Sequence, residues 1–121
     1  MSVLVDTSVW IDHLHKGDAR LAQLLTDGEV LVHPFVIGEL ASGLLKNRVE
    51  ILSLLHALPS LPKASDDELL EFIERNQLNG KGLALVDVHL LASCLLIGAR
   101  LWTRDKAIQR VAERLELTES P

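Results

Sequence analysis

The sequence predicts an α/β fold in which helices pack on a parallel sheet. Short apolar runs that are typical of buried strands alternate along the chain with longer segments of helical periodicity. Strands that alternate with helices favour parallel pairing, because each helix carries the chain back to the same end of the sheet. Only 3% of the 121 residues are aromatic, so the core must consist mainly of Leu, Val, Ile and Ala, which suits this architecture.

Three short apolar runs are expected to form the buried strands of the sheet. Each run contains β-branched or aromatic side chains and ends at a polar residue or a turn. These strands are predicted over residues 3–5, 30–32 and 100–103, and a final short strand is expected around Leu117.

Capping residues mark two helices between the first two strands. Thr7 and Ser8 supply N-cap chemistry for a helix that Gly17 ends. Asp18 can cap a second helix, which reaches about Thr26.

Further along the chain, apolar residues recur at helical spacing in five more segments. Ser65 and Glu68 match a capping box at the start of one of them. Residues 83–96 are apolar nearly all round, so they predict a central, buried helix with Gly98 at its C-cap. The other three expected helices cover residues 35–45, 49–58 and 105–115.

Length and composition bound the class of protein. Residues 1–121 have room for one domain, and 48% hydrophobic with 24% charged residues can build a core. The net charge of −5 argues against a general nucleic-acid coat, but it permits an acidic pocket that cations neutralise. The single cysteine, Cys94, excludes an internal disulfide and fits a reducing compartment.

No targeting or membrane segment is expected. The N-terminus has no basic region followed by a long apolar one. The longest apolar stretch, residues 83–98, contains Asp87 and His89 and is shorter than the roughly 20 apolar residues that span a bilayer. We therefore expect a cytoplasmic protein.

Four acidic residues stand out by their positions. Asp6 and Asp105 come directly after predicted strands, where ligands collect in folds of this kind. Glu39 and Asp87 lie within otherwise apolar helical stretches, where an isolated carboxylate is costly to bury. A shared divalent cation would satisfy all four, since hard cations prefer oxygen ligands.

A simpler interpretation stays open for each acid taken alone. Asp6 and Asp105 could only cap helices, and Asp87 could only complement a helix dipole. Glu39 could be a surface residue. The residues by themselves do not decide between these roles and a metal site.

Four segments, taken together, resemble the PIN-domain family, and in particular the VapC-type toxins of bacterial toxin–antitoxin pairs. They follow one another in order over almost the whole chain, and the first and last are the most specific. They are Val5-Asp6-Thr7-Ser8-Val9-Trp10-Ile11-Asp12, Ile37-Gly38-Glu39-Leu40, Val86-Asp87-Val88-His89-Leu90-Leu91-Ala92-Ser93 and Leu101-Trp102-Thr103-Arg104-Asp105.

The resemblance implies a three-layer α/β/α fold around a short parallel sheet. It also implies one or two Mg²⁺ or Mn²⁺ ions held by the four acids, with Thr103 and Ser8 beside them to position water. The implied ligands and catalytic residues are Asp6, Glu39, Asp87 and Asp105, with Thr103 as a further catalytic residue.

The implied activity is a metal-dependent endoribonuclease that cuts single-stranded or looped RNA. The implied partners are a small VapB-like antitoxin, which pushes a basic residue toward the acids, and a second copy of the chain in a homodimer. Apolar faces around Trp10, Leu14 and Leu44-Leu45 are candidates for the antitoxin groove, although a core role suits each of them too.

The hypothesis for the mechanism is in-line attack of an activated water on a backbone phosphate, with metal stabilising the leaving oxygen. The sequence offers no distinctive Cys–His or Ser–His pair, no P-loop and no His pair at zinc spacing. Basic residues in loops or at helix ends could line a phosphate path or could simply be solvated: Lys46, Arg48, Lys81, Arg104 and Lys106.

Two alternative functions are weighed against the nuclease. A receiver-type signalling domain has similar length and acidity, but it carries paired acids after its first strand and a Lys after its fifth, which this chain lacks. A catalytically silent PIN-like binding module normally lacks some of the site acids, whereas all four are present here.

Overall fold

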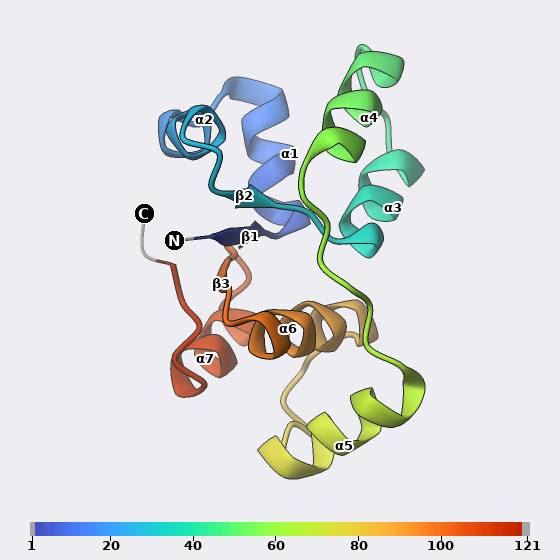
Figure 1. Ribbon diagram of the computed structural model, residues 1–121, viewed down its shortest axis with the longest axis vertical. Coiled ribbons are helices and arrows are strands. Elements are labelled where there is room, and N and C mark those ends of the chain that lie inside the picture. Colours follow the sequence, from blue (N-terminus) through green and yellow to red (C-terminus); the bar gives the residue numbers. More distant parts are fainter. Residues whose placement is uncertain (1, 120–121) are drawn as a thin grey trace.

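The computed structural model describes residues 2–119 and has three layers. Figure 1 shows a short sheet in the middle, with α1–α4 on one side and α5–α7 on the other. The strands are β1 (Val3–Val5), β2 (Val30–Leu31) and β3 (Arg100–Trp102). The helices are α1 (Thr7–Lys16), α2 (Ala19–Thr26), α3 (Pro34–Ser42), α4 (Arg48–Ala57), α5 (Asp66–Asn76), α6 (Leu85–Ile97) and α7 (Lys106–Arg114).

All strand pairs of the sheet are parallel, as the alternation of strands and helices predicts. The strand order is β2-β1-β3, so β1 lies at the centre. Val5 pairs with Trp102 at the end of β1 and β3, and the Asp6 amide donates to the Trp102 carbonyl at 2.9 Å. The residues that follow these two strands therefore leave the sheet side by side.

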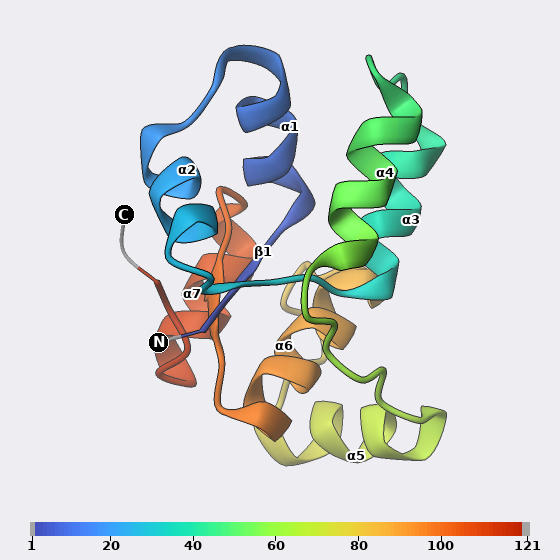
Figure 2. The ribbon, with the colours of Figure 1, turned by 45° about the horizontal axis from the view of Figure 1, so that its top comes forward.

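The core is largely aliphatic, as the composition predicts. The three strands are almost entirely buried, and Trp102 is the largest fully buried side chain. Residues 88–94 of α6 are all buried, because this helix lies between the sheet and α5. Figure 2 shows α5 on the outer side of α6, away from the strands.

The burial predicted for α6 is correct only for its middle. The helix begins at Leu85, not at residue 83, and Leu85 is exposed at its start. At the other end Leu95, Leu96 and Ile97 are exposed as well. An apolar sequence on all sides of a helix thus marks a buried centre, while its two ends extend beyond the layers that cover it.

The helix predicted over residues 35–45 ends earlier, at Ser42. Gly43 follows it in an extended conformation, and Leu44 is fully exposed. The Arg48 guanidinium donates to the Ala41 carbonyl at 2.6 Å, so a side chain binds a last-turn acceptor of α3. Helical spacing continues past residue 42, but the chain becomes extended at Gly43, the C-cap of α3.

Three smaller differences concern strand ends and a cap. Residue 32 makes only an isolated parallel bridge with Ser60, and the strand expected around Leu117 is a single bridge between Leu101 and Thr118. The N-cap of α1 is Asp6, whose carboxylate accepts from the Thr7 amide, and neither Thr7 nor Ser8 fills that role. No helix within residues 2–119 has the length and apolar character needed to cross a membrane.

Candidate metal centre

Asp6 is the buried centre of the candidate site. It follows β1 directly and is 6% exposed. Its Oδ2 accepts from the Thr103 hydroxyl at 2.7 Å and from the Ser8 hydroxyl at 2.8 Å, while Oδ1 accepts from the Thr7 amide. Three hydrogen-bond donors therefore satisfy this buried carboxylate without a cationic side chain.

Thr103 connects Asp6 with Asp105. The Thr103 hydroxyl donates to Asp6 and accepts from the Asp105 amide at 3.0 Å. Asp105 is exposed and caps α7, where its Oδ1 accepts from the amides of Ala107 and Ile108. The structure therefore joins the ends of β1 and β3 through one hydroxyl group.

Asp87 lies in the first turn of α6, where its Oδ2 accepts from the Ala84 amide at 2.8 Å. Burial raises the pKa of Asp87, the hydrogen bond from Ala84 opposes this, and the negative charges of Asp6, Asp105 and Glu39 raise it further. The other three acids are therefore near enough to act on this carboxyl group.

Glu39 differs from the expectation of a buried helical acid. Its side chain is exposed on α3, because the apolar residues of this short helix face inward on its other sides. The Thr7 hydroxyl donates to Glu39 Oε1 at 2.7 Å, which ties α3 to the start of α1. The sequence indicated no role for Thr7 beyond capping, and no local signal could reveal a contact across 32 residues.

Three of the four acids stand at helix N-termini. Asp6 and Asp105 are N-caps, and Asp87 is three residues into its helix. The partial positive charge of each N-terminus offsets part of the repulsion between the carboxylates. The capping roles that remained open from the sequence are therefore real, and they coexist with the clustering.

The acids do not form a ready-made ligand set in the structure. Within residues 2–119, no three side chains of His, Cys, Asp and Glu lie close enough together to hold a metal ion. Asp87 and Asp105 each direct one oxygen at backbone amides. No hydrogen bond among the described residues engages their second oxygens, and an all-carboxylate donor set suits a hard divalent cation that retains water ligands.

The basic residues near the site are partly engaged. Arg104 forms ion pairs of 2.8 Å with Asp12 and Asp18, and Arg48 binds carbonyls at the end of α3. Lys46 and Glu39 both line a groove of 510 Å³. Lys46 therefore shares this groove with one of the four acids, Glu39.

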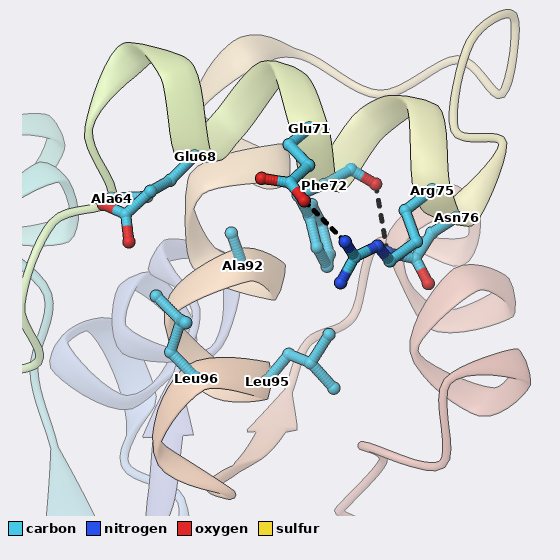
Figure 3. A pocket seen from close by; sticks show the side chains of 9 residues that line it. All are labelled: Ala64, Glu68, Glu71, Phe72, Arg75, Asn76, Ala92, Leu95 and Leu96. Carbon is cyan, nitrogen blue, oxygen red and sulfur yellow. Dashed lines mark hydrogen bonds and ion pairs between the residues drawn. The ribbon is translucent and has the colours of Figure 1, made fainter.

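This groove lies between α1, α3 and the start of α4, and Glu39 is the one of the four acids that lines it. Of the apolar residues considered for antitoxin docking, Leu14, Leu44 and Leu45 line it, whereas Trp10 is 4% exposed and belongs to the core. A second hollow, of 180 Å³, lies between α5 and α6 (Figure 3). Its lining contains the Glu71–Arg75 ion pair and apolar side chains of α6, and none of the four acids.

Comparison with known proteins identifies relatives over most of the chain. The PIN domain profile matches residues 3–114. Ribonuclease VapC32 from two Mycobacterium tuberculosis strains is 52% identical over 108 residues, which are 88% of this chain and 87% of that protein.

Two solved structures share the fold at low sequence identity. PAE2754 from Pyrobaculum aerophilum has a TM-score of 0.66 at 16% identity, covering 95% of this chain and 92% of the other. A chain from a structure described as FitAB bound to an IR36 DNA fragment has a TM-score of 0.60 at 14% identity, covering 92% and 90%. These two similarities support the three-layer architecture alone.

Proposed function

The chain belongs to the PIN-domain family, within it to the VapC-type toxin ribonucleases, and we propose that Asp6, Glu39, Asp87 and Asp105 hold the divalent cation of its reaction. The cation is Mg²⁺ or Mn²⁺, since both take carboxylate and water oxygens. The activity is endonucleolytic hydrolysis of RNA, by one domain that covers residues 1–121 and acts in the cytoplasm.

One observation carries this assignment of the site. The four carboxylates come from distant parts of the sequence, yet the fold brings them together: the Thr103 hydroxyl joins Asp6 to the Asp105 amide, and Thr7, next to Asp6, donates to Glu39. The negative charges of these three acids also raise the pKa of Asp87. Among residues 2–119, no ion pair joins these four acids to a basic side chain, which favours a cation that the protein binds.

Each residue of the site has a separate task in the proposed reaction. A bound divalent cation supplies the positive charge that activates water and neutralises the scissile phosphate. Asp6 is fixed by the hydroxyl groups of Ser8 and Thr103, so its oxygens keep one orientation during the reaction. Glu39 and Asp105 are exposed, so both are accessible to an RNA substrate.

RNA cleavage in the presence and absence of metal tests the function. A fluorescently labelled single-stranded RNA is incubated with the protein in Mn²⁺, in Mg²⁺ and in excess chelator. We expect internal cuts that require a divalent cation and that disappear in Asp87→Asn. Cleavage that persists in chelator, or at an unchanged rate in Asp87→Asn, would refute the proposed site.

The 510 Å³ groove is the proposed docking place of the antitoxin. Its floor is apolar, through side chains such as Leu14, Leu40 and Ile51, and Glu39 stands at its edge. An apolar segment of the antitoxin that binds here could place a basic residue next to Glu39. That residue would neutralise part of the negative charge of the site and so inhibit RNA cleavage. Leu14→Asp and Leu45→Asp should each abolish inhibition by the antitoxin while free RNA cleavage continues, and persistent inhibition would exclude the groove.

A homodimer is proposed as well, because several helices expose large apolar side chains. Such residues commonly mark protein interfaces when they gather in patches. Leu95, Leu96 and Ile97 are consecutive at the end of α6, and all three are exposed. Sedimentation or light scattering that gives the mass of a single chain at micromolar concentration would exclude a stable dimer.

A further inference from the structure

Arg104 stands between two residues of the site, but its side chain is held elsewhere. Its Nε lies 2.8 Å from Asp12 Oδ2, and one of its terminal nitrogens lies 2.8 Å from Asp18 Oδ2. The guanidinium also lies 5.8 Å from the centre of the Trp102 ring. Because the guanidinium has these three partners, it is not free to bind a phosphate of the substrate.

We propose that Arg104 is a positioning residue, which holds Thr103 and Asp105 against the start of α1 and does not bind RNA. This inference rests on the proposed function, because the geometry that Arg104 maintains is that of the acidic site.

The backbone of Arg104 is tied to the same helix as its side chain. The Arg104 amide donates to the Ser8 hydroxyl at 3.1 Å, and that hydroxyl donates to Asp6. Ser8 and Asp12 are four residues apart on α1, so they lie on one face of the helix. One face of α1 therefore holds Arg104 at its backbone and at its side chain.

Asp18 is itself fixed before it meets Arg104. It caps α2, where its Oδ1 accepts from the Leu21 amide at 3.0 Å and leaves Oδ2 for the guanidinium. The Leu21 amide, opposed by burial and assisted by Arg104, lowers the pKa of Asp18. Asp18 thus stays charged, and it links the loop after β3 to α2 as well as to α1.

The planar guanidinium suits this role because two separate nitrogens bind two separate carboxylates. A lysine ammonium is a single point charge and cannot bind two separate carboxylates in this fixed geometry. The paired side chains are partly exposed, 40% for Arg104 and 20% for Asp18, so we expect an effect on geometry more than on stability.

The two roles for Arg104 predict opposite results when its carboxylate partners are removed. If Arg104 bound a phosphate, neutralising Asp12 and Asp18 would free it, and RNA affinity would rise or stay constant. If Arg104 positions the site, the same change removes its anchors and slows cleavage. Asp18→Asn preserves the α2 cap, because Asn also accepts at the N-cap position.

The experiment compares Arg104→Met, the double variant Asp12→Asn/Asp18→Asn and the triple variant. Met keeps an apolar stem against Trp102 without the charge. We expect Arg104→Met to lower kcat about tenfold to a hundredfold, as small displacements of catalytic groups do. The double variant should show the same loss, and the triple variant no further loss, because all three changes break one unit.

Two readouts do not depend on cleavage. The affinity for labelled RNA in chelator should remain unchanged in Arg104→Met, and so should its dependence on salt, whereas loss of a phosphate contact would reduce the salt slope by about 1. The increase in melting temperature that Mn²⁺ causes should be smaller in Arg104→Met, because Asp105 is less well placed.

Arg75→Met is the matched control, since Arg75 forms an ion pair with Glu71 away from the acids (Figure 3). It should behave like the unmodified protein. Weaker RNA binding with unchanged kcat in Arg104→Met, or normal cleavage by the double variant, would overturn the positioning role. Failure of the unmodified protein to cleave RNA in Mn²⁺ would instead refute the proposed function.

Discussion

At the scale of single residues, one buried hydroxyl group connects two acids of the candidate site. Thr103 is 6% exposed, and its hydroxyl both donates to Asp6 and accepts from the Asp105 amide. This hydroxyl therefore both donates and accepts. A side chain of the same shape without the oxygen would leave the Asp105 amide without this partner, and it would remove one of the three donors to the Asp6 carboxylate.

Thr103→Val makes that change with little change in volume. We expect it to lower the free energy of unfolding by about 1–3 kcal/mol, the cost of a buried polar group left without its hydrogen bond. Urea unfolding in chelator measures the change, and Thr103→Ser should restore most of the loss. Equal stability of the Val variant and the unmodified protein would mean that the hydroxyl does not connect the two acids.

The Asp87→Asn variant tests whether Asp87 is needed for RNA cleavage or for the stability of the fold. The Asn side chain can still accept from the Ala84 amide, and it removes a charge whose pKa is raised by burial and by the other acids. We expect cleavage to be lost while the metal-free protein is as stable as before or more so. A thermal melt in chelator checks this, and gross unfolding of the variant would contradict it.

At the scale of elements, several short helices begin at a side chain that also serves the site. Asp105 starts α7 with two hydrogen bonds to backbone amides, and Asp6 starts α1. The sequence predicts that each of these residues caps a helix or belongs to a metal site, but it cannot show whether one residue does both. In Asp105 the cap uses one oxygen, and no hydrogen bond among the described residues engages the other. In Asp6 the second oxygen accepts from the hydroxyl groups of Ser8 and Thr103.

The two roles of Asp105 can be separated by a pair of substitutions. Asp105→Asn retains an oxygen for the amides of Ala107 and Ile108, so stability should remain within about 0.5 kcal/mol, whereas Asp105→Ala should cost about 1 kcal/mol as a lost N-cap. Both variants should lose cleavage. Urea unfolding together with the RNA assay tests this, and equal stability of the two variants would exclude the capping role.

The start of α3 contains a buried histidine that must stay neutral. His33 Nδ1 accepts from the Phe35 amide, and its Nε2 is buried without a hydrogen-bond partner among the described residues. Burial, with help from the positive charges of His89 and Lys63, lowers the pKa of His33 from 6.5 to about 4. The folded protein therefore binds this proton less readily than the unfolded chain does.

The lowered pKa predicts the direction of a pH effect on stability. The contribution of His33 is fully present above pH 6.5 and is lost as the pH falls toward about 4, by about 3 kcal/mol in total. His33→Asn keeps a side-chain acceptor for the Phe35 amide but does not titrate. Urea unfolding from pH 7.5 to 4 should show a shallower decline for the variant, and parallel curves would contradict the prediction.

Local patterns predict where elements lie better than where they end. Apolar runs and caps correctly locate the three paired strands and the seven helices within residues 2–119. The end of α3 and the exposed ends of α6 differ from expectation, because they depend on Arg48 and on the extent of neighbouring layers. These are tertiary contacts, which helical spacing along the chain does not contain.

At the scale of the whole molecule, the same limit applies to the site. Each acid can be selected from the sequence by its place after a strand or within an apolar helix. The contacts of Thr7 with Glu39 and of Arg104 with Asp12 join segments far apart in the chain, and only the assembled fold reveals them. The position of each acid in the sequence therefore marks it as a candidate site residue. The residues that support the acids can be identified only from contacts in the folded structure.

The proposed metal site predicts that the stability of the whole fold depends on divalent metal. The acids repel one another in chelator, and a cation that binds only the folded chain stabilises it by mass action. At a Mn²⁺ concentration of about 100 times its dissociation constant, the gain is about 2.7 kcal/mol, or about 10 °C in melting temperature. Thermal melts in a Mn²⁺ titration at constant ionic strength measure this increase.

Asp87→Asn provides the control for that titration, because it removes one ligand and part of the repulsion together. In chelator the variant should melt at the same temperature as the unmodified protein or higher, and in saturating Mn²⁺ it should melt lower. This reversal of order is specific to metal held among the acids, since screening by salt would raise both proteins alike. An equal increase in both proteins would place the bound metal elsewhere on the molecule.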